Sequence, residues 1–397
     1  MTIGISFIKT HNFITEKIKK TGRISSKDFI DICLYGNNGY YTYTRNSENV
    51  YFKDYATAPL THPAFGFLIS ILICNLIESF NTKEKIVINE FGAGNGTLAY
   101  DVSKSLNLLG YKNFKYNAID KLNSDSVTPI ISIDEKKPQK QNGIILTNEL
   151  FDALPHHLFV IKKNKLYEKY VELKGDKFIE VLDTPSDNCI QKRISLIEEN
   201  IDNSTGEIFC EKNSIFDLFK SNINKGYILT IDYGMSENNL FFKGKKNSNI
   251  SVINNHNFYK DYFYKPGFSD ITFQVDTKEL FRNYNSINFS NNFITTQREF
   301  LFELGIGEIL KKLSLSKKTF EEINLNRFAI NQLIKPNGMG NYFVSLHSNF
   351  NNDFSLNNLN IKKKFFDEIP YIKEFPQRFE LPGIYKKNNI IKEDWIK

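Results

Sequence analysis

Apolar and polar positions repeat at helical spacing in the first part of the chain. The repeat over residues 12–35 predicts two helices, because Thr21-Gly22 interrupts it and Ser25 or Ser26 is a suitable cap for the second. Residues 61–80 predict a further helix, whose apolar run extends from Phe65 to Leu76. This run is shorter than the roughly 20 residues of a membrane-spanning helix, so we expect a buried helix and no integral membrane segment.

A different pattern begins at residue 86, where short apolar runs alternate with helical segments. Five runs are expected to be strands: Ile86–Asn89, Phe114–Ile119, Gly143–Thr147, Gly226–Ile231 and Asn341–Leu346. Short buried strands that alternate with helices indicate a mostly parallel sheet covered on both faces. The first four runs are expected to belong to this sheet, and the last is expected to return to it as a late strand.

The stretch between the third and fourth of these strands is long. Residues 166–181 alternate as in an antiparallel hairpin with Gly175-Asp176 at its turn, and the pattern of residues 190–224 predicts helices. We therefore expect residues 161–225 to be an insertion into the sheet domain. Residues 235–330 are predicted to hold further helices that form a lid or second lobe.

These patterns divide the chain into five expected parts. They are a helical N-terminal extension (1–80), the first part of the sheet core (81–160), the inserted hairpin and helical segment (161–225), the remainder of the core with a lid-like insertion (226–350) and a C-terminal segment (351–397).

Composition adds little that is specific. The chain has 397 residues, of which 41% are hydrophobic and 24% charged, as in an ordinary soluble protein. Its net charge is +6, but lysines are spread along the chain, whereas a nucleic-acid binder concentrates them on one face, so we expect no nucleic-acid partner. The N-terminus has neither the pattern of a signal peptide nor that of an Arg-rich transit peptide, which predicts a cytoplasmic location.

The four cysteines, Cys33, Cys74, Cys189 and Cys210, are far apart in the sequence. No two of them form a C-x-x-C pair and there are only six histidines, so no metal site is expected. Four thiols in a chain of this length do not resemble a disulfide framework. They fit a reducing compartment and are expected to be ordinary core residues.

A glycine-rich segment, Glu90-Phe-Gly92-Ala-Gly94-Asn-Gly96, follows the first expected strand and precedes a helix that begins near Thr97. Ligands bind at the carboxyl edge of open parallel sheets, and glycines allow the backbone to approach a ligand closely. A dinucleotide fingerprint has G-x-G-x-x-G, but here the third glycine comes one position early. The spacing, with Glu90 two residues before the first glycine, suits S-adenosylmethionine better. A tight turn without a ligand is the alternative.

Acidic and amide side chains follow the next two strands. Asp120 ends the second strand, where a carboxylate can accept hydrogen bonds from both hydroxyls of a ribose, although Asp is also common in turns. Asn148, Glu149 and Asp152 follow the third strand. Two carboxylates match the planar donors of an arginine guanidinium and could orient it and accept its proton. Alternatively, these residues cap a helix.

A polar, turn-like segment, Lys53–Pro59, precedes the buried helix and by itself indicates only a loop. Taken in order from about residue 12 to 346, the chain resembles the MidA family of S-adenosylmethionine-dependent methyltransferases. The segments that carry the resemblance are Leu34-Tyr35, Gly39–Tyr41, Asp54–Pro59, Phe65-Gly66, Glu90–Asp101, Asn148–Pro155, Ile231–Gly234, Pro266-Gly267, Asp270–Thr272, Gln297–Ile306 and Pro336–Gly340.

The resemblance implies a class I, Rossmann-like α/β methyltransferase fold, with a mostly parallel sheet, a helical N-terminal extension and inserted helical and hairpin segments. It also implies S-adenosylmethionine as cofactor and a protein arginine as acceptor, because eukaryotic members of the family are mitochondrial protein-arginine methyltransferases that assist assembly of respiratory NADH dehydrogenase. The cofactor-binding candidates are Glu90, Gly92, Gly94, Gly96, Asp120 and Asn148. The catalytic candidates are Glu149, Asp152 and Asp54.

Two positions depart from the family pattern. Leu60 stands where the family usually has Glu, and Gln274 stands where it often has His. These departures leave open a cofactor-binding assembly or interaction factor without turnover, or a methyltransferase with a different acceptor. A nicotinamide-dependent oxidoreductase is a further alternative, although the early third glycine argues against it.

Overall fold

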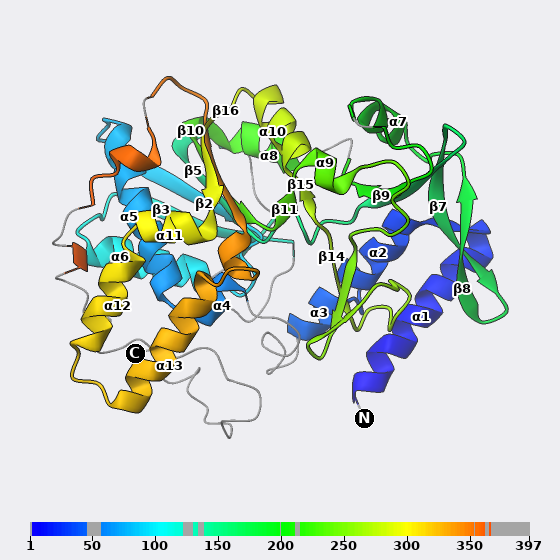
Figure 1. Ribbon diagram of the computed structural model, residues 1–397, viewed down its shortest axis with the longest axis horizontal. Coiled ribbons are helices and arrows are strands. Elements are labelled where there is room, and N and C mark those ends of the chain that lie inside the picture. The colour runs from blue at the N-terminus through cyan, green and yellow to red at the C-terminus, as the bar shows by residue number, and fades with distance from the viewer. Residues whose placement is uncertain are drawn as a thin grey trace. The chain divides into compact units, whose positions relative to one another are not determined.

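The chain folds into two units, each assembled from three separate segments. The computed structural model describes residues 2–45, 57–121, 130–133, 139–198, 200–210, 215–352, 354–361 and 365–366 (Figure 1). The first unit comprises Met1–Tyr55, Leu150–Asp217 and Gly234–Asn283. The second comprises Ala56–Glu149, Leu218–Tyr233 and Tyr284–Lys397.

A seven-stranded sheet forms the centre of the second unit. Its order is β16 (Ser290–Thr296), β17 (Phe343–Ser348), β10 (Ile223–Asp232), β5 (Gln141–Asn148), β2 (Ile86–Phe91), β3 (Phe114–Asp120) and β4 (Ile130–Ser132). The five strands from β10 to β4 are parallel, whereas β17 runs antiparallel to both of its neighbours. The mostly parallel α/β sheet predicted from the sequence is confirmed, and all five expected strands belong to it.

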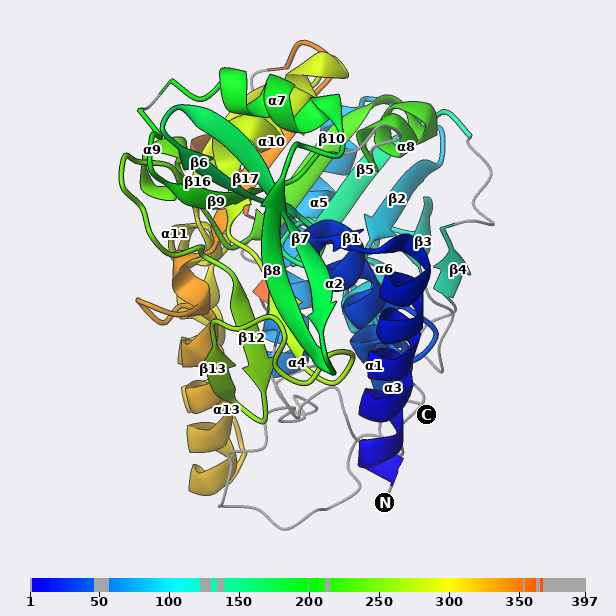
Figure 2. The same ribbon diagram turned by 90° about the vertical axis from the view of Figure 1, so that its right-hand side faces the viewer.

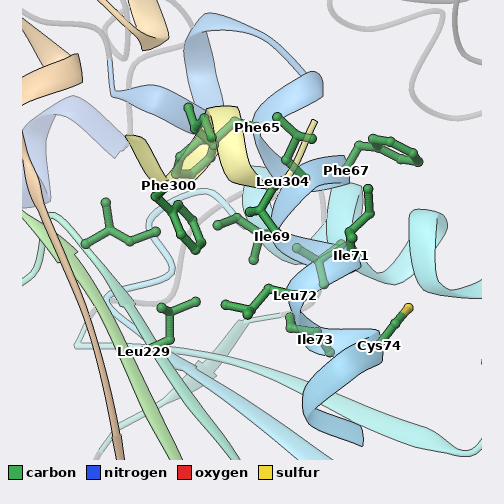
Figure 3. Close-up of a cluster of buried hydrophobic side chains, with 14 of the residues drawn as sticks. Phe65, Phe67, Ile69, Ile71, Leu72, Ile73, Cys74, Leu229, Phe300 and Leu304 are labelled. Carbon is green, nitrogen blue, oxygen red and sulfur yellow. The ribbon is translucent and has the colours of Figure 1, made fainter. Parts of the chain in front are cut away.

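Helix α5 (Ala64–Ser79) provides most of the core on one face of this sheet. Its sequence is apolar all around, so the helix is buried on nearly every side. Figure 3 shows its side chains meeting Leu229 of β10 and Phe300 of α11 (Gln297–Glu303). The other helices of the unit are α4 (Ala58–Thr61), α6 (Thr97–Leu108), α8 (Ile215–Asn222, its first residues in the first unit), α12 (Ile306–Ser314) and α13 (Phe320–Leu333), with short turns at Met339–Asn341 and Leu356–Asn358.

Successive side chains of a strand point to opposite faces of the sheet, and the face away from α5 is buried as well. In β10, Leu229 belongs to the α5 core, whereas the neighbouring Thr230 points away from it. The Thr230 hydroxyl lies 2.6 Å from the hydroxyl of Tyr284. On β2, the ring of Phe91 lies 5.0 Å from that of Phe219 on α8. Both faces of the sheet are therefore covered, which is why its strands are continuous apolar runs.

The first unit is built on an antiparallel sheet and the N-terminal helices. The sheet runs β1 (Ile24–Ser25), β7 (Lys165–Lys174), β6 (His157–Lys162) and β9 (Thr205–Ile208), with β8 (Lys177–Asp183) also paired to β7. Figure 2 shows the β7–β8 hairpin beside α1 (Thr2–Thr21). The Ser25 hydroxyl accepts a hydrogen bond from the Asp28 amide and caps α2 (Ser26–Tyr35), so the two predicted helices and the predicted hairpin are confirmed.

Short elements complete the first unit. They are α3 (Tyr40–Arg45), α7 (Asn188–Ser195), α9 (Glu237–Leu240), most of α10 (Thr277–Ser286), β11 (Gly234–Met235), β12 (Ser251–Asn254), β13 (Asn257–Tyr259), β14 (Asp270–Thr272) and β15 (Val275–Asp276). The prediction of helices throughout residues 190–224 is wrong in part. Strand β9 lies within that range because it pairs with β6 and adds an edge to the sheet, an interaction that local propensity does not show.

The cysteines also differ from expectation. Cys33 and Cys74 are buried thiols that belong to no disulfide, as predicted. Cys189 and Cys210 instead form a disulfide, with Cα atoms 6.1 Å apart, because α7 and the end of β9 bring them together. Within the described part of the chain, no helix is both long enough and apolar enough to cross a membrane.

Shortening a buried side chain of the core around α5 should destabilise the protein. Leu229 is fully buried, so we expect Leu229→Ala to lower the free energy of unfolding by about 2–5 kcal/mol, from lost burial and a residual cavity. Urea unfolding followed by circular dichroism measures this change. Leu315→Ala is the matched control, because Leu315 is 77% exposed. Equal losses in the two variants would contradict this account of the core.

Candidate functional site

The carboxyl ends of β3, β2 and β5 meet at one edge of the sheet in the second unit. From β2 the strand order proceeds through β3 to β4 on one side and through β5 to β10 on the other. The order therefore reverses next to β2. Ligands of open α/β sheets bind outside the carboxyl ends at such a reversal point. Most of the candidate residues follow these three strands.

The glycine-rich segment forms a tight turn between β2 and α6. Gly92, Gly94 and Gly96 have φ values of 76°, 58° and 77°, a left-handed region that favours glycine. The amides of Gly92 and Ala93 both donate to the carbonyl of Ile119, which fixes the turn against β3. A Cβ added at Gly94 would meet no atom within 4 Å, so the backbone there borders open space. This arrangement allows a ligand to approach the main chain.

Asp120 holds this turn from the end of β3. Its carboxylate Oδ2 accepts a hydrogen bond of 2.9 Å from the amide of Gly94. The residue is 8% exposed, so its carboxylate is fixed at the edge of the sheet. The sequence predicted that Asp120 would share a site with the glycines, and the structure brings Asp120 and Gly94 into direct contact.

Glu90 lies beneath the turn and is engaged by a residue that the sequence analysis did not select. The hydroxyl of Tyr116 donates a hydrogen bond of 2.9 Å to its carboxyl Oε2. Burial raises the pKa of Glu90 to about 8, and the nearby carboxylates of Asp120 and Asp101 raise it further against the effect of the Tyr116 hydrogen bond. Tyr116 could not be found from sequence because its proximity to Glu90 depends on the pairing of β2 with β3.

Asn148 ends β5 on the other side of β2. Its side-chain Oδ1 is buried and has no hydrogen-bond partner among the described residues. Its Nδ2 lies 3.4 Å from Oε1 of Glu149, at the limit of a hydrogen bond. A buried acceptor without a partner is costly in the free protein, and a ligand with a hydrogen-bond donor would remove that cost.

Glu149 has a backbone conformation that is uncommon for its residue type. Its φ is 49°, in the left-handed region that residues with a side chain seldom adopt. The Glu149 amide donates to the carbonyl of Ile231 at 2.8 Å, and the side-chain Oε1 accepts from the amide of Ala58 at 3.3 Å. Surrounding hydrogen bonds therefore hold this conformation, a situation that is frequent at functional sites.

The remaining candidates lie elsewhere. Asp152 belongs to the first unit, where it is 4% exposed and its carbonyl accepts a hydrogen bond from the amide of Phe273. Asp54 lies outside the described residues. Leu60 is buried in α4. Gln274 lines a cavity of about 30 Å³ within the first unit, together with His156, Arg193, Glu207, Asp276 and Glu279.

Apolar and charged residues together line that cavity, and several of its charged side chains pair with one another. The buried guanidinium of Arg193 forms ion pairs with Glu279 at 3.0 Å and with Glu237 at 3.1 Å, and it also contacts Asp276. The imidazole of His156 stacks on Phe273 with ring centroids 4.2 Å apart. Burial lowers the pKa of His156 to about 3, so its ring is neutral at physiological pH. These contacts explain the charged residues of the cavity by their packing and ion pairing with one another.

The residues at the sheet edge fit S-adenosylmethionine, the cofactor expected from the sequence. Bare backbone at Gly94 borders open space, Asn148 offers a buried acceptor, and Asp120 offers a carboxylate. Asp101 and Asp120 both raise the pKa of Glu90, so two further carboxyl groups lie close to it. A negative environment stabilises the positive charge of a sulfonium group. The chemistry of this set is therefore that of a cationic nucleoside site.

Comparison with known proteins agrees with this geometry. Residues 68–292, more than half of the chain, match the family described as "Putative S-adenosyl-L-methionine-dependent methyltransferase". The Caenorhabditis elegans protein named "Protein arginine methyltransferase NDUFAF7 homolog, mitochondrial" is 24% identical over 345 residues, which cover 76% of this chain and 77% of that protein.

Two crystal structures of Burkholderia thailandensis proteins share the fold. Both are 20% identical in sequence and cover 87% of this chain and 93% of theirs, with TM-scores of 0.76 and 0.74. The first of these proteins is bound to S-adenosyl-homocysteine. The likeness extends over both units of the chain and agrees with the class I methyltransferase fold predicted from the sequence.

The buried carboxyl of Glu90 predicts a pH-dependent stability. Its pKa of about 8 in the folded chain lies above the ordinary 4.5, so folding takes up a proton between these values. Stability from this group is complete below pH 4.5 and is lost as the pH rises towards 8. Relative to Glu90→Gln, we expect the free energy of unfolding of the wild type to fall by up to about 1.4 kcal/mol per pH unit in this window.

Urea unfolding of both proteins at pH 5, 6, 7 and 8 measures the difference. The Glu90→Gln variant keeps the shape of the side chain and an acceptor for Tyr116, but it cannot ionise. Parallel pH profiles for the two proteins would show that Glu90 is not held protonated.

Proposed function

Because the chain belongs to the family of S-adenosyl-L-methionine-dependent methyltransferases, we propose that it methylates an arginine side chain of a protein. Family membership gives the reaction class and the methyl donor, so a nicotinamide-dependent oxidoreductase is set aside. The acceptor is the proposed part. It is supported by the C. elegans relative, whose name describes a protein arginine methyltransferase. That relative is described as mitochondrial, and a cytoplasmic location for this chain stays a prediction.

The conformation of Glu149 carries the proposal. A non-glycine residue in the left-handed region costs of order 1–3 kcal/mol and persists only where its surroundings enforce it. Here the Ile231 carbonyl and the Ala58 amide hold Glu149 at the carboxyl end of β5, one strand from the glycine turn. This position suits a carboxylate that recognises a cationic acceptor, because guanidinium and carboxylate groups form paired hydrogen bonds.

The cofactor-binding roles follow from the same edge. Gly92, Gly94 and Gly96 would leave the main chain open to the cofactor, and Asp120 would accept hydrogen bonds from its ribose hydroxyls while holding the amide of Gly94. Asn148 would use its unpartnered Oδ1 as an acceptor. Glu90, held protonated by burial, would support the turn from below without adding a full charge.

The carboxylates proposed to bind the arginine would orient its guanidinium and remove a proton from it. When bound, S-adenosylmethionine supplies an electrophilic methyl group on a sulfonium centre. Glu149 would bind the guanidinium and orient one of its nitrogens for in-line attack. That nitrogen would gain the methyl group while the bond from methyl to sulfur breaks and S-adenosyl-homocysteine is left, and it would lose a proton, which a carboxylate would accept and pass to solvent. Asp152, three residues later in the sequence, is the second candidate for this role.

Methyl transfer can be tested directly. Purified protein, labelled S-adenosylmethionine and a lysate from cells that lack the gene should yield labelled protein, and mass spectrometry should find methylarginine in it. Label on another residue type would support a methyltransferase with a different acceptor. No label, combined with normal binding of S-adenosyl-homocysteine, would support an assembly factor without turnover, the alternative that Leu60 and Gln274 suggest.

The role of Asp120 predicts a loss of cofactor affinity. Asp120→Asn removes the charge that accepts hydrogen bonds from Gly94 and from the proposed ribose, and each such charged hydrogen bond is worth roughly 1.5–3 kcal/mol. We expect the Kd for S-adenosyl-homocysteine, measured by calorimetry, to rise by a factor of ten or more. Asp176→Asn, at the exposed turn of the β7–β8 hairpin, is the control. An unchanged Kd would remove Asp120 from the site.

For Asp152, in contrast to Asp120, we expect a change in turnover and not in cofactor affinity. Asp152→Asn should leave the affinity for S-adenosyl-homocysteine nearly intact and reduce turnover by roughly a hundredfold or more, because positioned proton acceptors contribute about 10²–10⁴ in rate. Calorimetry and single-turnover methylation measure the two quantities. Asp176→Asn again serves as the control. Equal turnover in Asp152→Asn and the wild type would exclude Asp152 from catalysis.

A further inference from the structure

Three side chains with metal-binding atoms meet in the first unit, in a cluster that the proposed methyl transfer does not use. One ring nitrogen of His157 and the sulfur atoms of Cys189 and Cys210 all lie within 4.8 Å of one another. They come from the start of β6, the first turn of α7 and the residues after β9. Their spacing in the sequence matches no common zinc motif, which is why sequence analysis expected no metal site.

A buried carboxylate orients the histidine of this cluster. Oε1 of Glu168, a fully buried residue of β7, lies 2.7 Å from Nδ1 of His157. With Nδ1 donating to the carboxylate, the other ring nitrogen, Nε2, carries the lone pair. Metal-binding histidines commonly have this arrangement, in which a carboxylate fixes the ring and makes the free nitrogen a better ligand.

The same carboxylate also anchors the segment that leads to the first cysteine. Oε2 of Glu168 accepts a hydrogen bond of 2.6 Å from the amide of Ser186. Asp187 then caps α7 by accepting from the Cys189 amide at 2.8 Å. On the other side, Cys210 is two residues beyond Ile208, which is the strand partner of His157. Each of the three side chains is therefore positioned by a defined backbone interaction.

We propose that, when its two cysteines are reduced, this cluster binds Zn²⁺ through Nε2 of His157 and the sulfur atoms of Cys189 and Cys210, with Glu168 as the residue that positions His157. Thiolate and imidazole ligands are those that zinc prefers, and three protein ligands leave one tetrahedral position for water. His157 is buried, whereas both cysteines are only partly buried, so a metal ion can reach the sulfur atoms from solvent.

The disulfide and the metal exclude each other. Two electrons and two protons convert the Cys189–Cys210 disulfide into two thiols, and a phosphine can supply the electrons while it is oxidised to its oxide with oxygen from water. Zn²⁺ then displaces both thiol protons as the two sulfur–metal bonds form, and Nε2 of His157 donates its lone pair. Binding therefore releases two protons and weakens as the pH falls.

The test uses the full chain in two redox states. One sample is reduced with a water-soluble phosphine, and the other is left with its disulfide intact. After treatment with a chelator and then with zinc chloride, each is desalted, and zinc per chain is measured by mass spectrometry with inductively coupled plasma. We expect one zinc ion per reduced chain and none per oxidised chain. Failure of the reduced chain to retain zinc would overturn the proposal.

Variants locate the bound metal. Cys189→Ser, Cys210→Ser and His157→Asn should each lower zinc affinity at least a hundredfold in competition with a chromogenic chelator, and Glu168→Gln should lower it about ten- to a hundredfold. Cys74→Ala, which removes a buried thiol of α5, should keep full zinc binding. Zinc retained by the three ligand variants would place the metal elsewhere and overturn the proposal.

A second measurement does not depend on affinity or on methyl transfer. Bound zinc should protect Cys189 and Cys210 from alkylation in the reduced chain, and peptide mass spectrometry can identify which cysteines are modified. Circular dichroism of each variant reports whether it folds, so that loss of metal can be separated from loss of structure. Equal alkylation of the two cysteines with and without zinc would contradict the assignment.

Discussion

The parallel register of β3, β2 and β5 is the constraint on which the candidate site depends. Phe91 on β2 pairs with Ile119 on β3 and with Thr147 on β5. The next residue along each strand is Gly92, Asp120 or Asn148, so all three emerge at the same level of the sheet. A shift of one residue in either pairing would turn one of these side chains to the opposite face.

The core and the site are linked through the same strands. The apolar face of the sheet is held by α5, and the alternate face is covered by residues such as Phe219 and Tyr284. Burial on both faces removes water from beneath the glycine turn, and this burial is what keeps Glu90 protonated. Asp120 and Asp101 are the two carboxyl groups that act electrostatically on Glu90.

Much of the fold could be predicted from sequence because its main signals are local. The runs at β2, β3, β5, β10 and β17 are short, apolar and bounded by polar turns, and the glycines mark the turn after β2 directly. Strand β9 was missed because its formation depends on pairing with β6, which is distant in the sequence. The Tyr116–Glu90 hydrogen bond and the meeting of Cys189 with Cys210 were missed for the same reason, since both depend on contacts between distant segments.

The place of β17 in the sheet has a consequence for how the protein is made. β17 lies between β10 and β16, yet it is the last strand of the sheet in the sequence. While the ribosome synthesises the chain, one hydrogen-bonding edge of β10 stays without its partner until residue 348 has emerged. An unpaired apolar strand edge promotes association with other chains. The nascent protein therefore depends on residues in its final quarter to complete the pairing of β10.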